Sequence, residues 1–181
     1  MPHPHDLLRV PFAFAFLVSF SGCGGAEPEP GAGVIEEGAA DWDTLFDGSD
    51  LAQWRGYHRA DVPSSWTITD GTLAFAPGGE RGDLISREQF GNFELRLQWR
   101  VSPGGNSGVI YRVDEAGELP WHTGAEMQVL DDDLHPDARP GVDRNRTAGA
   151  LYDLAGTPTG VVRPVGEWND ARIVANGNHL E

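Results

Sequence analysis

The sequence of 181 residues contains no lysine and only one cysteine. Arginine therefore supplies all 13 basic residues, which are opposed by 28 acidic residues and leave a formal net charge of −15. A surface this acidic repels phosphate backbones, so nucleic acid is excluded as a partner. A single cysteine can form neither an internal disulfide nor a cysteine-based zinc cluster.

Long apolar runs are also absent: the longest mainly apolar stretch, residues 10–20, is shorter than the roughly 20 residues of a membrane-spanning helix. It has the length of the hydrophobic region of a signal peptide, with Arg9 before it and small residues after it. Because Cys23 follows at once, residues 1–22 resemble a bacterial lipoprotein signal, with Cys23 as the lipidation site. The alternative is a plain secretory signal with an incidental cysteine.

Either signal takes the protein out of the cytoplasm. A lipidated Cys23 would anchor it to a membrane of the bacterial cell envelope, facing the periplasm or the exterior. Residues 24–40 are rich in glycine, proline and glutamate and lack strand or helix periodicity. Such a composition buries too little apolar surface to fold, so we expect residues 23–41 to form a flexible tether and residues 42–181 to form the domain.

The domain is predicted to be all-β. Residues 93–101 alternate between apolar and polar side chains, which is typical of a strand with one buried face. Asp70-Gly71 and Asn176-Gly177 are two-residue turn sequences that predict hairpins. Further strands are expected at 107–113, 125–130 and 148–154. Short strands separated by turns indicate a β-sandwich or barrel, and the short return after Asn176-Gly177 indicates an incomplete last hairpin.

Five segments in consistent order resemble the 3-keto-disaccharide hydrolase domain family. They are LFDGSDLAQW (45–54), FELRLQWRVSPGGNSGVIYR (93–112), GAEMQVLDD (124–132), TAGALYDL (147–154) and GEWNDARIVANGN (166–178). The resemblance implies a concanavalin-like jelly roll, in which two antiparallel sheets form a sandwich with a sugar-binding concave face. It also implies cleavage of glycosides whose glucose ring carries a ketone at carbon 3. The family continues beyond this last hairpin, so activity of residues 42–181 alone is an open question.

Alternation places Glu126 and Gln128 on the same face of one predicted strand. Glu126 is the candidate acid or base, and Gln128 is a candidate for gripping sugar hydroxyls. The pattern is loosely similar to the Glu-x-Asp-x-x-Glu of laminarinase-type glycosidases, but Gln128 replaces the middle acid. A conventional retaining mechanism with two carboxylates is therefore disfavoured. The alternative for Glu126 is a solvated strand residue.

A ketone at carbon 3 acidifies the hydrogen at carbon 2, so elimination at C1–C2 followed by hydration achieves net hydrolysis. We expect Glu126 to be the general base and Arg112 to stabilise the enolate oxygen. Arg96 and Arg100 are alternatives to Arg112, and a structural salt bridge is the alternative role for Arg112 itself. No cofactor is expected, although a divalent metal held by residues 131–133 or His122 stays open.

Further substrate contacts are expected from polar and aromatic side chains near these strands: Asn106, Ser107, Trp121, His122 and Tyr152. Each has a structural alternative as a turn cap or a core aromatic residue. The expected partner is an oligosaccharide or other glycoside. Two other functions remain open at this point, a non-catalytic carbohydrate-binding sandwich and a structural domain of a larger surface complex.

The predicted lipid anchor can be tested at Cys23. The variant Cys23→Ser should move the protein from the membrane fraction to the soluble fraction, because serine cannot carry a thioether-linked lipid. Fractionation followed by immunoblotting measures the distribution. A Cys23→Ser protein that stays with the membrane would contradict the lipoprotein assignment.

Overall fold

The computed structural model describes the strand 12–19, through its backbone, together with residues 42–76 and 78–181. Cys23 and the tether predicted at 23–41 lie outside these described residues. Within them the regular structure is β, apart from two short 3₁₀ turns, η1 (Pro120–His122) and η2 (Pro136–Ala138). This confirms the predicted all-β class. In the described part of the chain no helix is long and apolar enough to cross a membrane.

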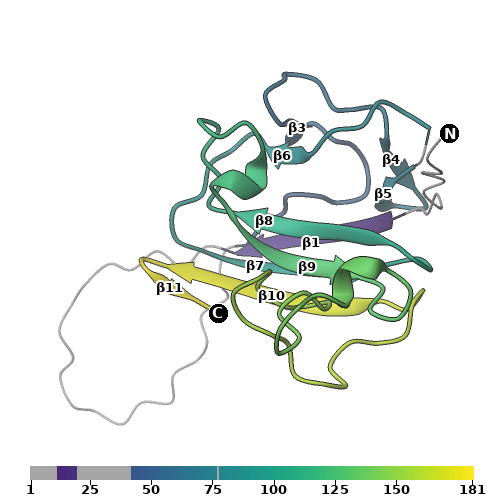
Figure 1. Cartoon of the computed structure of the whole chain (residues 1–181). Coiled ribbons are helices and arrows are strands. Elements are labelled where there is room, and N and C mark those ends of the chain that lie inside the picture. Colours follow the sequence, from purple (N-terminus) through teal and green to yellow (C-terminus); the bar gives the residue numbers. More distant parts are fainter. Residues whose placement is uncertain (1–11, 20–41, 77) are drawn as a thin grey trace, which may run out of the picture.

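The larger sheet is antiparallel and has the strand order β11-β10-β7-β1-β5-β4, with the short β2 paired to β1 (Figure 1). Its strands are β1 (Phe12–Ser19), β2 (Trp42–Asp43), β4 (Trp66–Thr69), β5 (Thr72–Phe75), β7 (Phe93–Arg100), β10 (Asn169–Asn176) and β11 (His179–Leu180). The β4–β5 hairpin turns at Asp70 and Gly71, whose φ angles of 52° and 71° are the two positive values that a type I′ turn requires.

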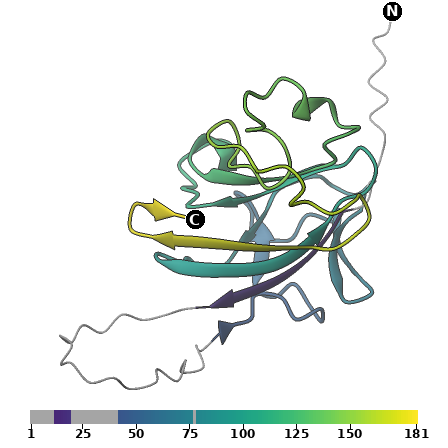
Figure 2. The same cartoon turned by 90° about the horizontal axis from the view of Figure 1, so that it is seen from below.

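Two smaller antiparallel strand pairs lie opposite the larger sheet. One joins β3 (Trp54–Gly56) to β6 (Leu84–Ser86), and the other joins β8 (Asn106–Tyr111) to β9 (Ala125–Leu130). Figure 2 shows β8 and β9 in a separate layer above β7 and β10, with the loops that follow β9 beyond them. The molecule is therefore a sandwich whose second layer consists of two separate strand pairs.

The core lies between these layers and is organised around β7. Leu95, Leu97 and Trp99 of β7 are buried and belong to one apolar cluster with Val109 of β8 and Val129 of β9. Phe93, at the start of the strand, is half-buried. The intervening side chains of β7 are half-buried at Glu94 and exposed at positions 96 and 98, as the sequence alternation predicts.

The outer face of the larger sheet is held by charged cross-strand contacts. Glu94 of β7 accepts hydrogen bonds from Arg172 of β10 at 2.9 and 3.0 Å and from Arg96 at 2.7 Å. The Arg96 guanidinium also lies 4.4 Å from the ring centroid of Trp42. The arginines predicted along β7 therefore belong to the outer surface of the sheet.

Two strand predictions are wrong in detail. The strand expected at 107–113 ends at Tyr111, because Arg112 has a φ of 58° in the left-handed region and leaves the ladder. The segment 148–154 forms turns, with only isolated bridges from Leu151 to Met127 and Ala155. The positive φ angles of Gly149 (78°) and Asp153 (58°) interrupt the extended backbone there.

Part of the predicted signal peptide is a strand in this structure. The backbone of β1 pairs with β7 over seven residues and with β5 over three, and it is a central strand of the larger sheet. The assignment of residues 1–22 to a cleaved signal peptide stays a prediction.

The packing predicts a sharp contrast between neighbouring positions of β7. Leu97→Ala should lower the free energy of unfolding by about 2–5 kcal/mol, because it leaves a cavity between the two layers. Gln98→Ala, one position along on the exposed face, should cost less than about 1 kcal/mol. Urea unfolding followed by tryptophan fluorescence measures both. A larger loss at Gln98 would show that the strand register is wrong.

Candidate active site

A cavity of about 970 Å³ opens between the β3–β6 pair and the β8–β9 pair. Its floor is apolar and comes from strands of both layers, including Leu73, Phe75, Phe93, Leu95 and Val109. Its polar lining includes the following charged residues: Arg55, Arg81, Asp83, Arg112, Glu115 and Glu126. An apolar cavity with a few converging charged groups is the usual form of a small-molecule site.

Glu126 reaches this cavity from β9. It pairs with Ile110 of β8, and its carboxylate lies over Gly108 of the same strand, so that a Cβ at position 108 would overlap the carboxylate. Gly108 is thus required by the space that the Glu126 side chain occupies. Within residues 42–76 and 78–181 the carboxylate has no hydrogen-bond or ion-pair partner.

The surroundings of Glu126 favour its protonated form. Burial raises the pKa of Glu126 to about 7, and the negative charges of Asp137 and Asp83 add to the effect. A carboxyl group with a pKa near neutrality can accept a proton from a weak carbon acid and later return it. The site therefore contains a carboxylate suited to general base chemistry.

Arg112 supplies positive charge to the same cavity. It follows β8 directly, lines the cavity and is exposed, and in the described part of the chain its guanidinium forms no ion pair. The structural salt bridge considered as the alternative for Arg112 is thus not present among these residues. Arg96 and Arg100 do not line the cavity: the former binds Glu94, and the latter lies 4.8 Å from the ring centroid of Trp168.

Three other predicted residues lie at the cavity. Asn106 and Ser107, at the start of β8, belong to its lining. Trp121, in the loop between β8 and β9, also lines it and is 52% exposed. His122 follows Trp121 and contacts it edge to face at 6.3 Å between ring centroids, but it does not line the cavity.

Gln128 and Tyr152 do not line this cavity, although the backbone N–H of Tyr152 donates to the Glu126 carbonyl at 2.9 Å. Gln128 is 1% exposed, and its Oε1 accepts a hydrogen bond from the backbone N–H of Val129. The Tyr152 hydroxyl donates to Asp137 at 3.0 Å, and Arg146 stacks over the Tyr152 ring. Burial, with the bond to Asp137, raises the pKa of Tyr152 to about 12. Glu126 and Arg112 therefore share the cavity lining, whereas the side chains of Gln128 and Tyr152 are not part of it.

Sequence reasoning missed several charged residues of the lining. Arg81 and Asp83 lie between β5 and β6, and Arg55 and Glu115 come from β3 and the β8–β9 loop. Burial raises the pKa of Asp83, which brings a second carboxylate to the cavity. Nothing in the local sequence marks these positions, because segments distant along the chain meet only in the fold.

The acidic run 131–133 has structural contacts. Asp131 is 2% exposed and accepts backbone hydrogen bonds from Gly104, Asp133 and Leu134. Asp132 accepts from the backbone N–H of Ala148 at 2.7 Å. In the part of the chain that the structure describes, no group of three or more histidine, cysteine or acidic side chains is arranged to hold a metal ion.

Sequence comparisons with known proteins point to one family. Residues 41–181 match the sequence model of the 3-keto-alpha-glucoside-1,2-lyase-like domain. A 3-keto-disaccharide hydrolase of Bacteroides thetaiotaomicron is 43% identical over 148 residues, which are 72% of this chain and 51% of that protein. The chain thus spans about half the length of this curated relative.

Solved structures agree with the fold. A candidate glycosyl hydrolase of Parabacteroides distasonis, solved at 1.70 Å, has a TM-score of 0.65 and 28% identity, covering 76% of this chain and 65% of that one. A second structure of a candidate glycosyl hydrolase from the same species has a TM-score of 0.54 and 29% identity, covering 70% and 65% of the two chains. These similarities confirm the predicted all-β sandwich fold of the concanavalin-like type.

The raised pKa of Glu126 predicts a pH-dependent stability. A folded-state pKa of about 7, above the usual value of 4.5, means that the folded state keeps a proton that the unfolded state releases between these pH values. Stability contributed by the protonated form is therefore lost as pH rises through this window.

Glu126→Gln removes this titration. The variant should be more stable than the wild type at pH 8 by up to about 3 kcal/mol, and the difference should shrink toward pH 4.5. Thermal unfolding across this pH range measures it. Equal stability of both proteins at every pH would contradict the raised pKa.

Proposed function

The chain belongs to the 3-keto-alpha-glucoside-1,2-lyase-like family, and from that membership we propose that it cleaves the glycosidic bond of 3-keto-disaccharides and 3-keto-glucosides. The observation that carries the proposal is that one cavity is lined by a carboxylate and an arginine, Glu126 and Arg112, which form no ion pair within the described part of the chain. A base and a cation are the two groups that enolate chemistry next to a ketone requires.

The proposed first step is an elimination. Glu126 takes the proton from carbon 2, and the electron pair of that C–H bond moves toward the ketone at carbon 3, giving an enolate. Arg112 stabilises the negative oxygen. The enolate then expels the aglycone oxygen from carbon 1, which leaves a carbon 1–carbon 2 double bond conjugated with the ketone. The released oxygen takes a proton from protonated Glu126 or from water, so the charges balance.

The proposed second step restores the sugar. Water adds to carbon 1 of the unsaturated ketone, and carbon 2 regains a proton, so the sum of both steps is hydrolysis. A carboxyl with a pKa of about 7 serves both directions, because it exists in both protonation states near neutral pH. Asn106, Ser107 and Trp121, which line the same cavity, are proposed to bind the hydroxyl groups and the ring face of the substrate.

We place this activity outside the cytoplasm, in the bacterial cell envelope. The order of apolar run, small residues and Cys23 in the sequence supports a lipid anchor, and the acidic domain would then act on glycosides in the periplasm or at the cell exterior.

Replacing the base tests the function. With a 3-keto-disaccharide as substrate, Glu126→Gln should lower kcat by about 10²–10⁴-fold while changing KM little, because the amide keeps its shape but cannot accept a proton. Glu118→Gln, on an exposed side chain outside the cavity lining, is the matched control and should retain full activity. Release of the free sugars measures turnover.

Three further measurements identify the chemistry. Solvent deuterium should enter carbon 2 of the product with the wild type, and unoxidised cellobiose or trehalose should not be cleaved, because their carbon 2 hydrogen is not acidic. The kcat/KM profile should fall on the acid side with an apparent pKa of about 7, since the base must be ionised. Efficient cleavage of cellobiose, or full activity of Glu126→Gln, would refute the proposal. Substrate binding without any turnover would support the carbohydrate-binding alternative.

A further inference from the structure

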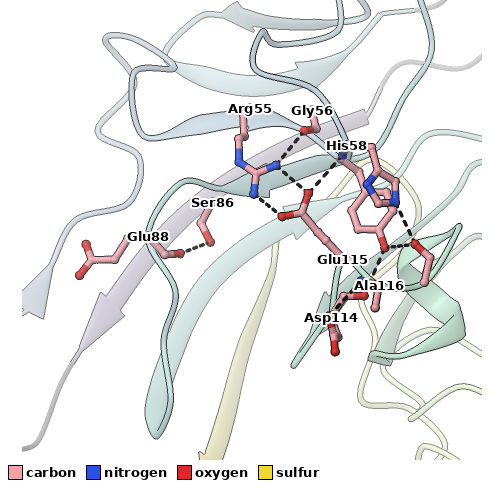
Figure 3. A network of polar contacts seen from close by, with 10 residues as sticks. Arg55, Gly56, His58, Ser86, Glu88, Asp114, Glu115 and Ala116 are labelled. Atoms are coloured by element: carbon pink, nitrogen blue, oxygen red, sulfur yellow. Dashed lines mark hydrogen bonds and ion pairs between the residues drawn. The ribbon is translucent and has the colours of Figure 1, made fainter.

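Two segments 60 residues apart are joined by an ion pair beside the cavity. Arg55 of β3 donates from both terminal nitrogens to the two carboxylate oxygens of Glu115, at 2.8 and 2.5 Å (Figure 3). Both side chains are mostly buried, with 21% and 29% of their surfaces exposed. A two-pronged, sheltered arginine–carboxylate pair fixes geometry better than a surface ion pair does.

The residues after Arg55 reinforce this contact. His58 donates its backbone N–H to Glu115 at 3.2 Å, and it does so with a φ of 56°, in the left-handed region. The Tyr57 hydroxyl donates to the carbonyl of Gly117 at 2.7 Å, and Nε2 of His58 lies 2.8 Å from the same oxygen. We call Arg55, Tyr57, His58 and Glu115 the clamp. It attaches the β8–β9 loop to the segment after β3.

The loop transmits this attachment to Trp121. A Cβ at Gly117 would lie 3.0 Å from Cγ2 of Thr123 and 3.4 Å from Cβ of His122, so the clamped residue packs against the η1 turn that contains Trp121. The Thr123 hydroxyl also bonds to the backbone of Asp114, at 3.0 Å both as acceptor and as donor. The loop is therefore one packed unit with the clamp at its base and Trp121 at the cavity.

Among the large apolar side chains in the described cavity lining, Trp121 is the one that is mostly exposed. A substrate whose carbon 2 lies at Glu126 places its second sugar elsewhere along the same cavity, whose lining includes Trp121. The exposed indole face offers that second ring a flat surface for stacking.

We propose that the clamp is a positioning device that holds Trp121 against the second sugar of a 3-keto-disaccharide and so makes the enzyme selective for disaccharides over glycosides with small aglycones. This inference rests on the proposed function, because it concerns recognition of the same substrate class at the same cavity.

The Arg55–Glu115 ion pair of the clamp persists throughout the pH range in which Glu126 titrates. Hydrogen bonds from Arg55 lower the pKa of Glu115 to about 2, so Glu115 stays ionised at every pH well above that value. Its stabilising contribution is lost only as pH falls from the usual value of 4.5 toward 2. Selectivity that depends on this ion pair should accordingly be retained between pH 5 and 8 in a His58→Gln background, whereas turnover should change with pH.

The test uses Glu115→Gln with two substrates, a 3-keto-disaccharide and methyl 3-keto-glucoside. We expect kcat/KM for the disaccharide to fall about tenfold, mainly through KM, and for the methyl glycoside to fall less than about threefold. Backbone amides of residues 112–124 should exchange faster with deuterium. Glu80→Gln is the matched control, because Glu80 forms an exposed ion pair with Arg59 outside the cavity lining.

A double-mutant cycle with Trp121→Ala decides whether the clamp acts through the indole. Once Trp121 is absent, Glu115→Gln should cause no further loss with the disaccharide. Additive losses, or equal losses with both substrates, would overturn the proposal. Tyr57→Phe, which removes the hydroxyl bonded to the carbonyls of Gly117 and Asp114, should give a smaller loss in the same direction and serves if Glu115→Gln fails to fold.

Binding measurements separate this inference from the proposed function. Isothermal titration measures the affinity for the 3-keto-disaccharide, and this affinity depends on the clamp whether or not the bond is cleaved. A wild type that binds but shows no turnover would refute the proposed function, but it would leave the positioning of Trp121 intact. Equal affinities of the wild type and Glu115→Gln for the disaccharide would overturn the inference, whatever the activity.

Discussion

The functional side chains take their direction from the packing of β7 against the β8–β9 pair. Val109 and Val129 face the apolar side of β7, so the alternate positions of the same two strands, including Gly108 and Glu126, point to the opposite face. A slip of one residue in β9 would turn Glu126 toward β7 and turn Val129 to the opposite face. The strand register that packs the apolar core therefore also fixes the direction in which the Glu126 side chain points.

Charge is distributed unevenly around this framework. On the outer face of the larger sheet, arginines neutralise carboxylates, as Arg172 does for Glu94. At the cavity, Arg55 is bound to Glu115, whereas Glu126 and Asp83 have no basic partner among the described residues. Burying an uncompensated carboxylate costs stability, and the same desolvation brings the pKa of Glu126 close to neutral pH. The group that weakens the fold is thus the one that is suited to proton transfer.

The sequence was sufficient for features set by local periodicity and turn chemistry. Alternation located β7 and β9, and Asp70-Gly71 located a hairpin, because these signals depend on neighbouring residues. Strand prediction failed at Arg112 and at 148–154, where residues with positive φ end or interrupt the extended backbone. Arg112 and Asp153 are not glycines, so the sequence does not mark these positions as turns. The position of Asp83 in the cavity and the contacts of the clamp could not be predicted from the sequence, since they arise where distant segments meet in the fold. Gln128 was misplaced relative to the cavity because the chain after β9 covers it, with the backbone of Gln128 bonded to Gly149 and Ala150.

The segment Phe12–Ser19 shows where sequence patterns are ambiguous in principle. A short apolar run suits the hydrophobic region of a signal peptide, and it equally suits a central strand with neighbours on both edges. In the structure its backbone completes the ladders of β5 and β7, whose facing edges would otherwise each carry unpaired N–H and C=O groups. Cleavage before Cys23 would remove that strand. The sheet would then need another strand, or a direct approach of β5 to β7, to pair the edges that β1 occupies in this structure.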